Sequence, residues 1–161
     1  MTGPVVLDNT VLSNFALVDA VELVKRLWEG VAGLTPAVLA EYKAGASHGT
    51  SPAGAWADLP VLTLTENEAA FVATLSTRLG AGERASLAVA VHRRGLLASD
   101  DRDARNAARQ HGVPTTGTLG ILAACVRLGY LGRNEGNALL AKMIVAGYRS
   151  PVTNLDQLLD V

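Results

Sequence analysis

The chain of 161 residues has little of several residue types that would point to particular classes of protein. Its single cysteine, Cys125, lies in an apolar helical run, which predicts a thiol in the core, not a nucleophile, and excludes an internal disulfide. Aromatic residues make up only 4%, so we expect a core of aliphatic side chains. The 49% hydrophobic content excludes disorder and is enough for a core of ordinary size.

Positive charge is not in excess either. The chain has 14 Lys and Arg against 15 Asp and Glu, a formal net charge of −1, whereas dedicated nucleic-acid binders usually have a basic excess. Any contact with RNA or DNA would therefore depend on local arginines and on bound cations. No N-terminal apolar stretch is long enough for a signal peptide or a membrane span, so we expect a soluble cytoplasmic protein without a membrane contact.

Short apolar runs alternate with helical segments along the chain. The runs predict strands at residues 4–7, 31–34, 59–64, 96–99 and 113–115. Strands alternating with helices are typical of a parallel sheet covered by helices on both faces. We therefore predict one α/β domain of three layers over residues 1–161, with a central parallel sheet flanked by helices and a helical C-terminal extension over about 133–161.

Three sequence signals set the expected helix starts. Thr35 and Pro36 are a cap and a first helical residue, and Thr65 with Glu68 forms a capping box before a helix expected at 69–79. The glycines at 80 and 82 interrupt this pattern, and a further helix is expected from Glu83 to Arg93.

Acidic residues follow two of the expected strands. Asp8 comes after the run 5–7, and the pair Asp100 and Asp101 comes after the run 96–99. Because parallel strands present their carboxyl ends at the same edge of a sheet, these side chains should meet in the usual ligand crevice. Each could instead cap the helix that follows it, and the sequence does not show which of Asp100 and Asp101 does so.

Two glutamates add to this set. Glu41 borders the apolar stripe of its helix, so it is either buried and in need of a cation or Arg, or exposed at the edge of the stripe. Glu83 begins a nearly all-apolar helix, where the helix dipole alone could also account for it.

Carboxylates gathered from distant segments repel each other unless a hard cation lies among them. An all-carboxylate set favours Mg²⁺ or Mn²⁺ over zinc, because His48, His92 and His111 are scattered and fit surface or capping roles. The chemistry expected of such a site is hydrolysis of a phosphodiester by metal-activated water.

The sequence argues against two other enzyme classes. Residues 80–85 fit the dinucleotide-binding pattern G-x-G-x-x-A, but that motif must follow a strand, and a helix is expected before it. A phosphatase that forms an aspartyl phosphate would have a second Asp two residues after Asp8, where Thr10 stands.

Five segments in order resemble PIN domains, the metal-dependent ribonuclease fold of VapC-like toxins. They are VLDNTVLS at 6–13, TPAVLAEY at 35–42, GERASLA at 82–88, ASDDRDAR at 98–105 and TGTLGIL at 116–122. The chain looks closest to a shorter PIN-like branch with a TGTLG motif and an extra C-terminal helical pair. The resemblance covers nearly the whole chain and implies a three-layer PIN-like domain.

The resemblance also implies functional residues and partners. It maps the catalytic and metal-binding acids onto Asp8, Glu41, Glu83, Asp100 and Asp101, and it gives Thr116 or Thr118 the positioning of a water or phosphate. It implies Mg²⁺ or Mn²⁺, an RNA substrate, a homodimer and an antitoxin partner.

Three arginines are candidates for holding the RNA backbone: Arg102, Arg105 and Arg84. A solvated helix face would explain them equally well. The alternative function is a catalytically idle PIN-fold module that binds a protein partner.

Overall fold

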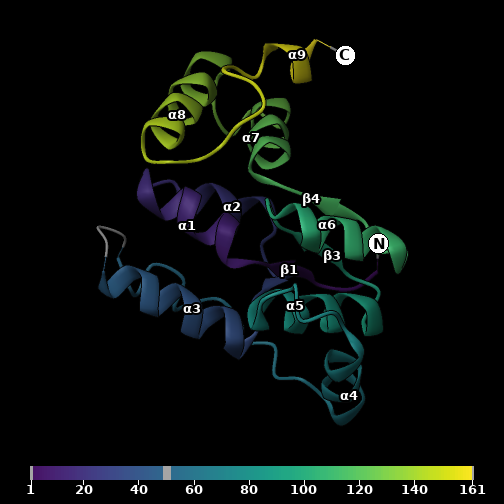
Figure 1. Cartoon of the computed structure of the whole chain (residues 1–161). Helices are drawn as coiled ribbons and strands as arrows, with labels where there is room; N and C mark the ends of the chain where they lie inside the picture. Colours follow the sequence, from purple (N-terminus) through teal and green to yellow (C-terminus); the bar gives the residue numbers. More distant parts are fainter. Residues whose placement is uncertain (1, 49–51, 161) are drawn as a thin grey trace.

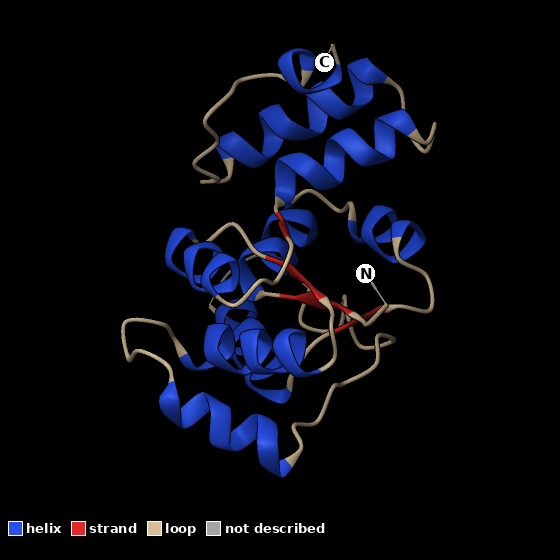
Figure 2. Cartoon of the chain, turned by 90° about the vertical axis from the view of Figure 1, so that its right-hand side faces the viewer, coloured by secondary structure: helices blue, strands red, loops and turns tan. Residues whose placement is uncertain are grey.

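The computed structural model describes residues 2–48 and 52–160. Its sheet consists of β1 (Val5–Leu7), β2 (Ala32–Gly33), β3 (Leu96–Ala98) and β4 (Thr115–Thr116), all parallel, in the order β2-β1-β3-β4 (Figure 2). From β1 the chain adds β2 on one side and then returns to add β3 on the other. The connections therefore diverge between β1 and β3, and in open α/β sheets ligands bind outside the carboxyl ends of strands at such a point.

Helices cover the sheet on both sides (Figure 1). They are α1 (Asn9–Leu17), α2 (Val21–Leu27), α3 (Pro36–Ser47), α4 (Glu66–Thr74), α5 (Ala81–His92), α6 (Arg102–Gln110), α7 (Thr118–Arg127), α8 (Arg133–Val145) and α9 (Asp156–Leu159). In Figure 1, α7, α8 and α9 lie above the sheet, and α3, α4 and α5 lie below it. Within the described residues, no helix has both the length and the apolar character that crossing a membrane requires.

The residues of β1 show why the fold has three layers. Val5 and Leu7 belong to a core cluster with α1, α7 and α8, whereas Val6 belongs to a second cluster with Leu87 of α5 and Ala108 of α6. All three strand residues are fully buried. Since successive side chains of a strand point to opposite faces, the apolar run 5–7 supplies both cores at once. The predicted three-layer α/β fold is confirmed.

The expected helix caps form, with shifted bounds. The Thr35 hydroxyl accepts a hydrogen bond from the Val38 amide at 3.3 Å, and Thr65 forms a complete capping box with Glu68. However, α4 spans 66–74 and not 69–79, because a turn around Ser76 follows it. The next helix begins at Ala81 and not at Glu83, since Gly80 is its cap.

Two strand predictions were wrong in their extent. The segment 59–64 makes only an isolated parallel bridge, Leu34 to Val61, because Pro60 has no N–H to donate and the Thr63 carbonyl accepts from Arg93. The last strand lies at Thr115–Thr116 and not at 113–115, because the Val113 amide donates back to the Ala108 carbonyl at 2.8 Å and Pro114 has no N–H to donate.

The C-terminal helices are built into the first core cluster. Leu140 and Met143 of α8 and Leu155 before α9 are buried there. The Asn137 side chain accepts a hydrogen bond from the Leu155 amide at 2.7 Å, and Arg133 pairs with Asp156 and Asp160. The segment between α8 and α9 is therefore fixed at both ends.

Candidate active site

Asp8 lies at the carboxyl end of β1, where the sheet connections diverge. It is 2% exposed and occupies the cap position of α1, yet its side chain makes no cap hydrogen bond. One carboxylate oxygen instead accepts a hydrogen bond of 2.7 Å from the Ser99 hydroxyl. Helix capping, the structural explanation for an Asp at this position, therefore does not account for the side chain.

The electrostatic surroundings of Asp8 disfavour its charge. Burial raises the pKa of Asp8, the Ser99 hydroxyl and the Asn9 amide lower it, and the negative charges of Glu41 and Asp101 raise it again. The net direction is upward. A buried carboxylate with a raised pKa and like-charged neighbours is typical of functional sites.

Glu41 reaches the start of α5 from α3. Its Oε1 accepts a hydrogen bond of 2.8 Å from the Gly82 amide, so the half-buried carboxylate lies against the positive end of a helix. A Cβ at residue 82 would lie 2.7–2.8 Å from the carboxylate atoms of Glu41. A glycine at this position is therefore what lets the helix approach the acid.

Glu83 is also half-buried at the start of α5 and accepts a 2.9 Å hydrogen bond from the Gly80 amide. Burial raises the pKa of Glu83, while the Gly80 hydrogen bond lowers it. The charges of Asp101, Asp8 and Glu41 act in the same direction as burial, and the net pKa is raised. The four acids thus form one electrostatically coupled group.

The two consecutive aspartates have different surroundings. Asp100 accepts hydrogen bonds from the Asn14 amide group at 3.0 Å, from the Thr118 amide at 2.8 Å and from the Thr118 hydroxyl, so it holds the start of α7. Asp101 caps α6 through the Ala104 amide at 2.8 Å, and its charge acts on both Asp8 and Glu83. The charge of Asp101 therefore acts on Asp8 and Glu83, whereas the Asp100 carboxylate is engaged with α7 and Asn14.

The two threonines differ in access. Thr118 is fully buried, with its hydroxyl donated to Asp100, whereas Thr116 is half-buried and lines a pocket beside α6. Of the three candidate arginines, Arg102 and Arg105 line that same pocket, and Arg105 also donates to the Ser99 carbonyl at 3.2 Å. Arg84 lies elsewhere, on α5, and reaches the Gly80 carbonyl at 3.4 Å.

The donor chemistry of the coupled acids suits a hard cation, since every ligand they offer is an oxygen. Burial is the main cause of the raised pKa values of Asp8 and Glu83, and repulsion from the neighbouring acids adds to it. A bound cation would relieve this repulsion. The spacing is looser than a closed metal site. Over residues 2–48 and 52–160, no three or more His, Cys, Asp or Glu side chains come together closely enough to hold an ion.

Other candidate groups lie away from this site. Burial raises the pKa of the Cys125 thiol to about 11, which agrees with a core thiol. The rings of His92 and His111 bond helix carbonyls and contact Phe71 edge-on. Gly80 follows helix α4 and a turn, so the dinucleotide pattern lacks the strand it requires.

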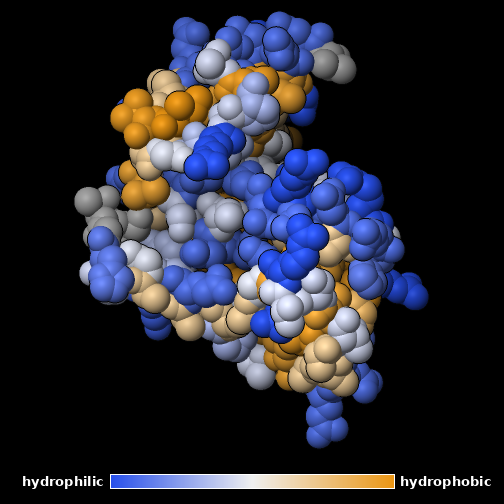
Figure 3. All heavy atoms as spheres, in the orientation of Figure 1, coloured by the Kyte–Doolittle hydropathy of each residue, from blue (hydrophilic) through white to orange (hydrophobic). Residues whose placement is uncertain are grey.

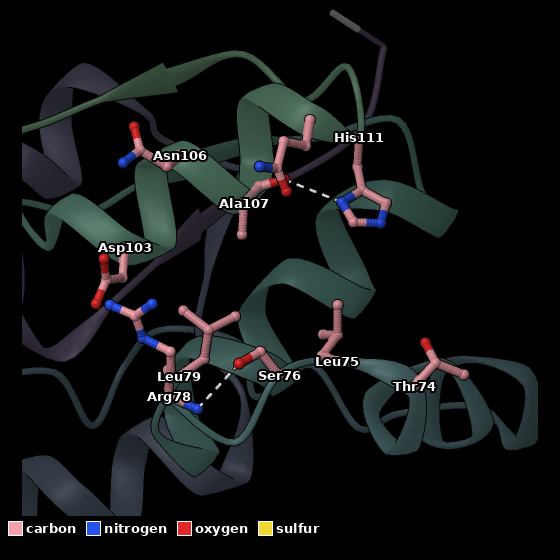
Figure 4. Close-up of a pocket in the computed structure, with 10 residues that line it drawn as sticks. Thr74, Leu75, Ser76, Arg78, Leu79, Asp103, Asn106, Ala107 and His111 are labelled. Carbon is pink, nitrogen blue, oxygen red and sulfur yellow. Dashed lines mark hydrogen bonds between the residues drawn. The ribbon is translucent and has the colours of Figure 1, made fainter.

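A hollow of about 460 Å³ lies between the α4–α5 turn and α6, and none of the coupled acids lines it (Figure 4). Asp103 and Arg78 lie toward one another there, on different elements. Asp103 is exposed and lines this hollow, to which Asp100 and Asp101 do not contribute.

Three polar residues that the sequence did not identify as candidates form hydrogen bonds with the acids. Ser99 is fully buried, donates to Asp8 and accepts from the Asp101 amide at 3.1 Å, so one hydroxyl joins two acids. The Thr10 hydroxyl accepts from the Asp100 amide at 2.9 Å, and Asn14 donates to Asp100. The only sequence signal for them is their place beside strand ends and on one side of α1.

Comparison with known proteins agrees with this geometry. A family model described as a PIN domain matches residues 4–161, nearly the whole chain. PIN domains are in general nucleases that act on nucleic acids, typically with divalent metal ions. No curated protein matches the chain. The three-layer fold and the extent of the family match together mean that this chain belongs to the PIN-domain family.

Proposed function

We propose that this protein is a Mg²⁺- or Mn²⁺-dependent endoribonuclease that hydrolyses RNA phosphodiester bonds. The observation that carries the proposal is the coupled acidic group around Asp8, a buried carboxylate whose pKa is raised at the switch point of the sheet. A protein gains no stability from such an arrangement, because unpaired buried charge costs free energy. Function is the physical reason to keep it.

Asp8, Glu41, Glu83 and Asp101 are the residues that would hold the ion or ions. A bound divalent ion supplies an activated water and offsets the charge that develops on the phosphate oxygens. The Ser99 hydroxyl holds the Asp8 carboxylate in place by donating a hydrogen bond to it, and the Gly82 amide does the same for Glu41. Asp100 supports the site indirectly, by holding the start of α7 beside it.

Substrate contacts fall to groups that remain accessible. Thr116 is the better candidate for positioning a phosphate or water, because the Thr118 hydroxyl is buried against Asp100. Arg102 and Arg105 would hold the RNA backbone beside Asp100, and Arg84 would contact it from α5.

The biological role follows the resemblance to VapC-like toxins. We propose that the chain is the toxin of a type II toxin–antitoxin pair, acts in the cytoplasm as a homodimer, and is blocked by an antitoxin that covers the acids. A short neighbouring gene for a DNA-binding protein with a flexible tail would favour this role. Co-expression with that gene should relieve growth arrest caused by this chain alone.

The test is cleavage of total RNA by the purified protein with Mn²⁺, Mg²⁺ or EDTA. We expect discrete fragments with either metal, none with EDTA, and a loss of at least 100-fold for Asp8→Asn. Asp58→Asn is the matched control, since this exposed aspartate pairs with Lys25 away from the site. An intact RNA pool with both metals, together with Mn²⁺ affinity unchanged by Asp8→Asn, would favour the idle interaction module.

A further inference from the structure

A pocket of about 620 Å³ beside the acids is lined by four arginines. It lies between α6, the β4–α7 junction and the segment that follows α8, and its arginines are Arg102, Arg105, Arg109 and Arg149. We call it the arginine groove. In the described part of the chain none of the four forms a salt bridge. Figure 3 shows hydrophilic side chains gathered over α6 on this face.

Four guanidinium groups and one carboxylate line the groove, so its positive charge is only partly neutralised from within. Asp100 is the acid among the described lining residues, and its oxygens already accept hydrogen bonds from Asn14 and Thr118. Arg109 donates only to a neutral partner, the Asn106 side chain, at 3.1 Å. In a chain of net charge −1, four unpaired guanidinium groups around one hollow indicate an anionic ligand with several charges.

The groove continues toward Asp8. A second hollow of about 350 Å³ is lined by the start of α1, including Asn9 and Thr10, and it shares Asp100, Tyr148 and Arg149 with the arginine groove. The two hollows together therefore run from the arginines of α6 to Asn9, the residue that directly follows Asp8.

Two features favour a nucleic-acid strand over a small anion. The positive groups are spread along a groove and not focused on one point, and the aromatic Tyr148 stands where its two hollows meet. Arginines that follow a groove, with an aromatic ring among them, are the arrangement used to bind single-stranded nucleic acid. The wall carrying Tyr148 and Arg149 is held by the contacts of α8 and α9, including the Tyr148 amide to the Met143 carbonyl at 2.9 Å.

We infer that the arginine groove binds the phosphodiester backbone of a single-stranded nucleic acid, and that the C-terminal segment supplies one wall of it through Tyr148 and Arg149. This adds Arg109, Arg149 and Tyr148 to the substrate contacts, whereas Arg84 does not line the groove. That the bound strand leads to the acids rests on the proposed nuclease function. The binding of the strand in the groove does not.

The test measures binding without cleavage. The full chain carrying Asp8→Asn is titrated, in EDTA, into a labelled 12-nucleotide single-stranded RNA, the same DNA sequence and an RNA duplex, at 50–200 mM salt. Arg109→Ala and Arg149→Ala are compared with Arg94→Ala. Arg94 is exposed and precedes β3, at the opposite, amino-terminal edge of the sheet. The substitution Arg94→Ala therefore removes one positive charge, as the groove variants do, but from outside the groove.

Each groove variant should reduce the slope of log K against log salt by about 0.7, the value for one phosphate contact on a single strand. With 1 M salt as the reference, this slope corresponds to roughly 8-fold weaker binding at 50 mM and roughly 4-fold at 150 mM. Arg94→Ala should change neither quantity. RNA and DNA strands that bind alike indicate recognition of the backbone alone, and tighter RNA binding adds contacts to the ribose.

Three results would overturn the inference: groove variants that bind as tightly as Arg94→Ala, a duplex that binds as well as the single strand, or poly-glutamate that competes equally at equal charge. The last would identify an acidic protein segment as the ligand. Since no metal or turnover enters this measurement, absence of cleavage by the unmodified protein would count against the nuclease proposal and not against the groove.

Discussion

The substitution Asp8→Asn should make the protein more stable while it abolishes cleavage. At neutral pH the buried Asp8 carboxylate suffers desolvation and repulsion from Glu41 and Asp101, and the Ser99 hydrogen bond compensates only in part. Asn has the same shape, still offers Ser99 an acceptor and carries no charge. The change removes the repulsion without opening a cavity.

The expected size follows from two opposing contributions. Burying one ion costs several kcal/mol after relaxation, and a hydrogen bond to a charged group returns about 1.5–3 kcal/mol. We therefore expect a net gain of about 1–2 kcal/mol for Asp8→Asn. For a chain of this length each kcal/mol raises Tm by about 2–4 °C, so the variant should melt about 2–8 °C higher.

The stability advantage of Asp8→Asn should depend on pH, in a direction that the raised pKa of Asp8 sets. Because the pKa of Asp8 is raised on folding, the native protein binds this proton more tightly than the unfolded chain does. The ionised group therefore destabilises the fold above its native pKa, and this cost disappears as pH falls through that pKa toward the ordinary value of 3.8. The advantage of Asp8→Asn should thus be largest near pH 7.5 and shrink toward pH 4.

Thermal melts followed by circular dichroism at pH 7.5, 5.5 and 4 measure this advantage. Asp58→Asn is the control of opposite sign, because Lys25 lowers the pKa of that exposed carboxylate, so its loss should leave Tm unchanged or slightly lower. Saturating Mn²⁺ should raise Tm of the unmodified protein more than that of Asp8→Asn. A lower Tm for Asp8→Asn at pH 7.5 would refute the reasoning.

Three further substitutions address the neighbours of Asp8. Gly82→Ala should displace the Glu41 carboxylate and weaken Mn²⁺ binding by about 10-fold or more in calorimetry, and unchanged affinity would exclude Glu41 as a ligand. Asp101→Asn should abolish cleavage yet keep the urea midpoint, since Asn caps a helix as well as Asp does. Asp100→Asn should instead lower stability by about 1–3 kcal/mol through the start of α7; equal effects of the two in both assays would contradict their assigned roles.

The fold and the acid positions could be predicted from local pattern. The run 5–7 followed by Asp8, and the run 96–99 followed by Asp100 and Asp101, identify β1, β3 and the edge at which their acids lie. The apolar residues of segment 59–64 predict a full strand, but Pro60 cannot donate a backbone hydrogen bond, and only an isolated bridge forms. Which of Asp100 and Asp101 joins the acids could not be read, since both follow the strand and only the contacts of α6 and α7 separate them.

Two glycines show what local pattern could not supply. A positive φ is a common reason for a glycine, yet neither Gly82 nor Gly117 has one. A Cβ at Gly117 would lie 2.5 Å from the carboxylate of Asp100, which is 17 positions away in the sequence. A Cβ at Gly82 would likewise collide with the carboxylate of Glu41, which is 41 positions away. Each glycine lets the start of a helix reach a carboxylate, so that a backbone amide offsets part of its charge. Backbone amide hydrogen bonds of this kind allow several carboxylates to lie at one edge of the sheet in the absence of a bound cation.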